Sequence, residues 1–272
     1  MGVALERLGQ LDVALMRFEQ GLELRRVAVQ GPHLLTAGAL VSVAGAMQRL
    51  GRTRQALDRY LEAENMLIKC LGPDELLVGE VHVCIGGVHA DRLEHSLALS
   101  RYFDALALFS KAGAGPLTLS AQHRRIGEVY RRQGQLKKAL AHFSGALDVR
   151  SRLLGERYSG MCNMDVAGVH FQMGEFDLAL THYQRALECH SLAASNGTVN
   201  GEIVDVAHAL GSMALVYEKK RDWHRSWELC ARALDRGRLR RLGEPRGYKF
   251  VGCSREERLL AEDEGMAERN FD

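Results

Sequence analysis

Apolar residues with helical spacing recur along the first 240 residues, and each group follows a short turn. The recurring phrase is a glycine, an alanine five residues later, an aromatic four residues after the alanine, and often a second alanine. Clear copies are Gly9…Ala14…Phe18, Gly51…Ala56…Tyr60, Gly134…Ala139…Phe143…Ala146 and Gly174…Ala179…Tyr183…Ala186, and weaker copies are Ser100…Ala105…Phe109…Ala112 and Arg221…Ser226…Cys230…Ala233. Since residues four apart share one face of a helix, the spacing predicts a helix after each turn.

Each position of the phrase has a mechanical role. Glycine ends the preceding helix at little cost because it accepts the left-handed cap conformation. The alanine lets two helices approach closely, and the aromatic fills the wedge between neighbouring hairpins. Upstream of one glycine, Ile126, Gly127 and Tyr130 mark the first helix of the same pair. One pair cannot cover its own apolar face but stacked pairs can, so we expect an all-α array of helix hairpins.

This pattern resembles the tetratricopeptide repeat (TPR) over roughly residues 1–240. The basic repeat has about 34 residues, but Gly9 to Gly51 spans 42 residues and Gly134 to Gly174 spans 40. The additional residues follow the second helix and end in a Leu-Gly turn, which is similar to the kinesin light chain variety. That variety favours a His-Pro pair after the turn, and this chain has none. The resemblance implies a right-handed α-α superhelix, a TPR solenoid of about five and a half hairpins, with a partner-binding groove.

The domain organisation follows from these spacings. We expect the array in residues 1–240, with repeats at 1–30 (truncated), 31–73, 74–115, 116–156, 157–200 and 201–240, and a linker with a short C-terminal capping helix in residues 241–272. The first repeat lacks most of its first helix, so either the chain is a fragment of a longer protein, which we favour, or a partner covers that end. Seven additional residues before Ser100 are expected either to lengthen the third repeat's first helix or to form a longer turn.

The candidate binding residues lie on the first helices, which line the concave face of such an array. Positions not needed for packing point into the groove; these are Val41, Gly45 and Gln48, then Val83 and Gly87, then Arg124, Glu128 and Arg131, then Met164, Gly168 and Phe171, with Gln172 at the edge. We expect Arg124 and Arg131 to pair with carboxylates of a bound peptide.

The charge balance argues against one class of function, and the cysteine spacing indicates the compartment. The 36 basic and 34 acidic residues nearly cancel, whereas a nucleic-acid cradle usually has a basic excess. The six cysteines form no CxxC pair, which favours a reducing, cytoplasmic setting. No apolar run approaches the roughly 20 residues of a membrane span.

No catalytic or metal-binding motif is present in the sequence. Walker, HExxH, GxSxG and Rossmann patterns are missing. We expect His82, His89 and His95 to share one long helix, but zinc needs three or four converging ligands, so no metal or cofactor is predicted. Trp227 is expected to fill the core. The basic stretch from Arg236 to Arg241 is interpreted as a solvated helix end.

The sequence therefore predicts a non-enzymatic scaffold or adaptor, similar to a cargo adaptor, that binds another protein or peptide in its groove. The alternative is a regulatory or targeting TPR fragment of a larger enzyme or signalling protein. A third and weaker hypothesis is nucleic-acid association through the stretch from Arg236 to Arg241. The oligomeric state does not follow from the sequence.

Overall fold

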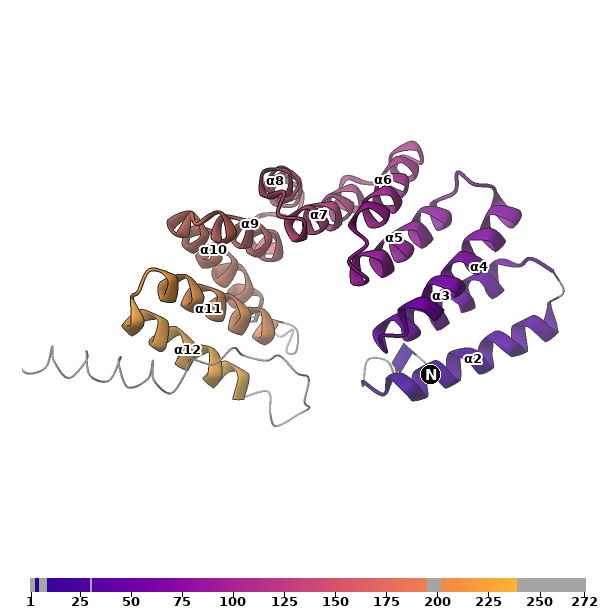
Figure 1. The fold of residues 1–272 in the computed structure, drawn as a ribbon, viewed down its shortest axis with the longest axis horizontal. Coiled ribbons are helices and arrows are strands. Elements are labelled where there is room, and N and C mark those ends of the chain that lie inside the picture. The colour runs from indigo at the N-terminus through magenta and orange to yellow at the C-terminus, as the bar shows by residue number, and fades with distance from the viewer. Residues whose placement is uncertain (1–2, 5–8, 30, 195–201, 239–272) are drawn as a thin grey trace, which may run out of the picture. The chain divides into compact units, whose positions relative to one another are not determined.

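The computed structural model describes residues 3–4, 9–29, 31–194 and 202–238, and the regular elements in these ranges are helical (Figure 1). The chain divides into two compact units, residues 1–135 and 136–272. The first unit contains α2 (Leu11–Ala28), α3 (Leu34–Arg49), α4 (Thr53–Leu71), α5 (Leu76–Asp91), α6 (His95–Lys111) and α7 (Pro116–Arg132). The second contains α8 (Leu136–Leu154), the short 3-10 helix η1 (Glu156–Tyr158), α9 (Gly160–Met173), α10 (Phe176–Ala194), α11 (Glu202–Lys219) and α12 (Trp223–Arg238).

Within each unit, every helix packs against the next one along the chain, as expected of an all-α hairpin array. In the first unit α2 contacts α3, α3 contacts α4, and so on to α7, and the two first helices α3 and α5 also touch. In the second unit α9 pairs with α10 and α11 with α12, while α10 contacts α11 between the pairs. This consecutive packing is that of a TPR solenoid.

The alanines and aromatics of the recurring phrase form much of the core. Ala56 is fully buried and Tyr60 is 3% exposed on α4, where they pack with residues of α3 such as Leu40. In the second unit, Ala179 and Tyr183 of α10 pack with apolar residues of α11. Alanine at these positions lets the helix axes approach, and the buried ring fills the space that remains.

The turns between paired helices correct one prediction. Gly51, Gly134 and Gly174 have φ of +77°, +74° and +79°, and the equivalent residues of the third and sixth repeats are Leu93 and Arg221, both at φ +61°. The third phrase therefore begins at Leu93 and continues through Ala98 and Tyr102, which are buried. The phrase assigned from Ser100 was seven residues too late.

Two further predictions are wrong because they relied on this misplaced phrase. The seven residues before Ser100 neither lengthen the first helix of the third repeat nor form a longer turn, because α5 ends at Asp91 and α6 begins at His95. His82 and His89 share α5, but His95 does not, so the three histidines are not on one helix. The prediction that Trp227 fills the core is also wrong, because its side chain is 37% exposed on α12.

Several predictions concern residues outside the described ranges. These are the linker and capping helix of residues 241–272, the basic residues Arg240 and Arg241, and most of the truncated first helix in residues 1–8.

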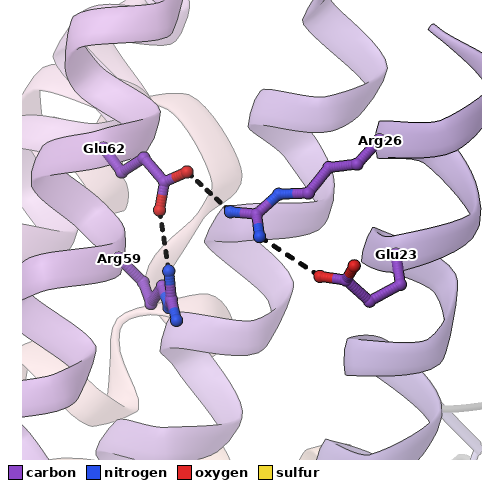
Figure 2. Close-up of polar contacts among 4 residues, drawn as sticks. All are labelled: Glu23, Arg26, Arg59 and Glu62. Atoms are coloured by element: carbon purple, nitrogen blue, oxygen red, sulfur yellow. Dashed lines mark hydrogen bonds and ion pairs between the residues drawn. The ribbon is translucent and has the colours of Figure 1, made fainter.

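Ion pairs connect second helices of successive hairpins, as Figure 2 shows for α2 and α4. Arg26 of α2 lies between Glu23, at 3.2 Å, and Glu62 of α4, at 2.7 Å, and Glu62 also accepts from Arg59 at 2.9 Å. Arg26 and Glu62 are more than a third exposed, so each such pair contributes at most about 1 kcal/mol.

A more buried ion pair joins the next helices. Glu64 of α4 is 12% exposed and lies 2.7 Å from Nε2 of His82 on α5 and 2.6 Å from Arg101 of α6. The hydrogen bond from His82, together with Arg101, holds the pKa of the Glu64 carboxyl below its ordinary value, although burial works in the opposite direction. The carboxylate of Glu64 therefore connects three consecutive helices, α4, α5 and α6.

Candidate partner-binding surface

The turns supply a common reference for comparing the first helices. Six residues before the turn lie Gly45 of α3, Gly87 of α5, Glu128 of α7 and Gly168 of α9. In the first unit, these positions share one side of their helices with neighbouring polar residues. We call this the first-helix face, and it is lined by Gly45, Gln48, Gly87, Asp91, Arg125, Glu128 and Arg132.

Gln48 links the first helices of two hairpins. Its Nε2 donates to Oδ2 of Asp91 on α5 at 2.6 Å, and its Oε1 accepts from the hydroxyl of Tyr60 at 3.3 Å. The predicted groove residue therefore lies on the first-helix face, where its amide is held by α4 and α5. Asp91 was not predicted, although its position two residues before the turn places it beside the end of α3.

The charged residues of α7 are organised around Glu128. Arg131 donates to both carboxylate oxygens of Glu128 at 2.8 Å, and Arg132 donates to one of them at 2.8 Å. Burial works to raise the pKa of Glu128, but these hydrogen bonds outweigh it and the pKa lies below its ordinary value. Arg131 is thus engaged within its own helix, and Arg124 is half-buried with contacts of its own.

Arg125 and Arg132 are exposed on α7, and the sequence interpretation missed both. Their positive charges work to lower the pKa of Tyr102 on α6, the second helix of the preceding hairpin, against the larger effect of burial. Arg125 contacts only the carbonyl oxygen of Ala121, at 3.5 Å, and no described carboxylate lies within ion-pair distance of it. The run of paired arginines in α7 was the signal that could have identified them.

Three glycines of the first helices each lie above a tyrosine of the following second helix. A Cβ at Gly45 would lie 3.5 Å from the Tyr60 hydroxyl, one at Gly87 would lie 3.8 Å from that of Tyr102, and one at Gly168 would lie 3.9 Å from that of Tyr183. The glycine is fifteen residues before the tyrosine in every case. In the first unit, the missing side chains leave the hydroxyls of Tyr60 and Tyr102 at the base of the first-helix face.

The second unit holds the remaining predicted residues. Met164 and Phe171 of α9 are half-buried and pack against the core shared with α10 and α11, and the Phe171 ring lies 6.0 Å from that of Phe176. Gln172 is exposed at the end of α9. Met164 and Phe171 therefore contribute to packing as well as to the outer side of α9.

A polar cluster joins η1, α9 and α10 in the second unit. The amide oxygen of Asn163 lies 2.9 Å from Nδ1 of His182, and its Nδ2 donates to the Ser159 hydroxyl at 3.1 Å. His170 stacks on His182 with ring centroids 5.6 Å apart. Burial, and then the charges of His170 and Arg185, lower the pKa of His182. These contacts connect α9 with α10 and with the residue that follows η1.

Metal and membrane sites were sought in the described residues. No group of three or more His, Cys, Asp or Glu side chains there is arranged to hold a metal ion. None of the helices in those ranges is long and apolar enough to cross a membrane.

A family model for the tetratricopeptide repeat matches residues 1–69 and 117–191, more than half of the chain. The chain belongs to the tetratricopeptide repeat family. This TPR array has no significant match among curated protein sequences.

Solved structures share the TPR fold at low sequence identity. BtubC (BKLC) from P. vanneervenii superposes with a TM-score of 0.70 at 17% identity, covering 90% of this chain and 97% of that one. A kinesin light chain with nearly identical TPR-like repeats from Podosopora anserina has a TM-score of 0.59 at 14% identity, covering 72% and 93%. Aspartyl phosphate phosphatase F from Bacillus subtilis has a TM-score of 0.62 at 12% identity, covering 89% and 70%. The neighbours thus include the kinesin light chain variety indicated by the long repeats.

Proposed function

We propose that this TPR array is a non-enzymatic scaffold that binds an extended peptide or a helix of another protein along its first-helix face. TPR arrays are interaction scaffolds whose first helices line a binding surface. The observation that carries the proposal is the pair of glycines Gly45 and Gly87 on adjacent first helices. Both lack a side chain where the helix surface is open, so a partner's main chain can approach the helix backbone closely.

The polar residues around these glycines give the face its chemistry. Gln48 and Asp91 lie on one side of Gly87, and Arg125 and Arg132 lie toward the other, on α7. Such a surface offers both donors and acceptors to a peptide, and a few of these contacts determine which partner binds. We assign the charged contacts of a partner to Arg125 and Arg132, since Arg131 is already bonded to Glu128.

The test uses random twelve-residue peptides displayed on phage and selected on the full chain. A selected peptide is then measured by fluorescence polarisation against Gly87→Leu, whose side chain covers the face. The matched control is Gly21→Leu on α2, a second helix, where an added Cβ meets nothing within 4 Å. We expect Gly87→Leu to weaken binding at least tenfold and Gly21→Leu to leave it unchanged. Equal affinities for the two variants would place the binding surface elsewhere.

A further inference from the structure

The hydroxyl of Tyr102 has no hydrogen-bond partner among the described residues, although its side chain is only 5% exposed. A tyrosine ring at this depth normally has its hydroxyl bonded. Burial raises the pKa of Tyr102 to about 12, so the hydroxyl stays protonated at neutral pH and remains a donor. The hydroxyl is not among the buried polar atoms that lack a partner, so it reaches the surface, where either water or an acceptor from a bound partner completes its hydrogen bond.

The equivalent tyrosine of the second repeat differs in this respect, because its hydroxyl has an acceptor within the chain. Tyr60 donates to Gln48 at 3.3 Å, and Tyr183 also has interactions of its own. All three lie beneath a glycine at similar distance, between 3.5 and 3.9 Å. Gln48 points instead toward α5, with its Nε2 3.5 Å from a Cβ at Gly87 and bonded to Asp91. It therefore brings its donor group, and no acceptor, to the edge of the Tyr102 site.

The charges around Tyr102 decide which acceptor suits it. Arg125 and Arg132 act on the hydroxyl with positive charge, and Asp91 acts with negative charge. Arg132 is bonded to Glu128, which offsets part of its charge. A site with both signs nearby does not favour a charged ligand strongly, whereas a neutral carbonyl oxygen meets no like charge there.

The space above the hydroxyl decides how that acceptor arrives. Because Gly87 has no side chain, the atoms nearest to its Cβ position are Nε2 of Gln48, at 3.5 Å, and the Tyr102 hydroxyl, at 3.8 Å. A main chain laid across α5 can come close enough there to place a carbonyl oxygen at hydrogen-bond distance, which a Cβ at 3.8 Å from the hydroxyl would hinder. Hydroxyl hydrogen bonds to oxygen have a donor-acceptor distance of about 2.7 Å.

We propose that the Tyr102 hydroxyl donates a hydrogen bond to a main-chain carbonyl of an extended peptide that crosses α5 at Gly87. This contact recognises the main chain of the peptide and does not depend on which side chain the peptide carries at that position. Specificity is left to the side chains that flank the site, Gln48, Asp91 and Arg125. The inference rests on the proposed function and assigns one contact within the first-helix face.

The experiment compares Tyr102→Phe with the unchanged protein, using the same phage-selected peptide that is measured against Gly87→Leu. Phenylalanine keeps the buried ring, and the hydroxyl makes no hydrogen bond to a described residue, so we expect the unfolding midpoint to stay the same. Loss of one neutral hydrogen bond predicts binding about threefold to tenfold weaker. Gly87→Ala, which adds only a methyl group beside the hydroxyl, should reduce affinity in the same direction.

Peptide variants identify the acceptor. A thioamide in place of one main-chain amide, moved along the peptide, should remove the Tyr102→Phe effect at a single position, because a thiocarbonyl is a weaker acceptor. If replacement of an acidic peptide side chain by alanine removes the effect instead, the acceptor is a carboxylate and the proposal is wrong. If Gly87→Leu abolishes binding but Tyr102→Phe changes nothing, the hydrogen bond is refuted while the scaffold function stands. If neither variant changes the affinity, both proposals fail.

Discussion

Two neighbouring glycines of α5, Gly86 and Gly87, should respond differently to substitution by alanine. A Cβ at Gly86 would lie 2.7 Å from Cε1 and 2.8 Å from Cδ1 of the Tyr102 ring, whereas one at Gly87 would lie no closer than 3.5 Å to any neighbour. Alanine in place of glycine stabilises a helix interior by about 1 kcal/mol at either position. The two substitutions therefore differ only in what the added methyl group meets.

The magnitude follows from the freedom of the ring. Tyr102 is 5% exposed and packs with Ala98 and Ile126, so it cannot move away without disturbing that core. Overpacking of this kind costs about 1–3 kcal/mol, which cancels or exceeds the gain in helix propensity. We expect Gly87→Ala to raise the free energy of unfolding by about 1 kcal/mol and Gly86→Ala to fall about 1–3 kcal/mol below it.

The assay is denaturant unfolding of both variants, followed by far-ultraviolet circular dichroism and by tyrosine fluorescence. The comparison between neighbours removes effects that both share, including changes in the unfolded chain. If the two variants differ by less than about 0.5 kcal/mol, within ordinary additivity error, the close approach of α5 and α6 at Gly86 is not as the structure places it.

Three other outcomes follow from the same structure. Leu93→Gly should stabilise the protein by about 0.5–1 kcal/mol, because left-handed backbone is costly for leucine and this side chain is 68% exposed. The control is Leu97→Gly within α6, which should lower the stability of the protein in thermal unfolding. Glu64→Gln should cost about 3 kcal/mol, the low end for a broken buried ion pair, because its partner Arg101 is 29% exposed. Glu62→Gln, half a turn away, should cost less than about 1 kcal/mol in the same measurement. The pKa of His182 is lower in the folded protein than its ordinary value of 6.5, so the unfolded chain binds the proton more readily and stability should fall as the pH drops below about 6.5. His182→Gln should remove this part of the pH dependence when the melting temperature is measured against pH. An unchanged pH dependence would contradict the assignment to His182.

The register of the third repeat shows where sequence reasoning reached its limit. The helix hairpins followed from the alanine and aromatic spacing, but the turn was located by its glycine, and Leu93 occupies that place. A shift of seven residues is about two helical turns, so the misplaced phrase still fell on buried residues, Ala105 and Phe109. Periodicity cannot separate two registers that bury the same face. Only the backbone conformation at Leu93 distinguishes them.

Some residues of the candidate site could also be predicted from the sequence, and others could not. The sequence identified Gln48 and Glu128 as positions on the first helices, but it assigned Arg131 to a peptide carboxylate, although its three-residue spacing from Glu128 favours the ion pair that forms within α7. The contact of Gln48 with Asp91 was not foreseeable, because it joins residues 43 apart in the chain. The same holds for Tyr102, whose alanine and aromatic pattern predicts a core ring and says nothing about its hydroxyl.

The relation between glycine and tyrosine suggests why the fourth repeat differs. Where a second helix carries tyrosine, at residues 60, 102 and 183, the position fifteen residues earlier is glycine. In the fourth repeat the aromatic is Phe143, which has no hydroxyl, and the earlier position is Glu128. Glycine is useful only if a polar group beneath it must reach the surface, and with phenylalanine that reason is lost. A carboxylate on the first helix then supplies polarity directly, so each of these repeats keeps a polar group on its first-helix side but takes it from a different helix.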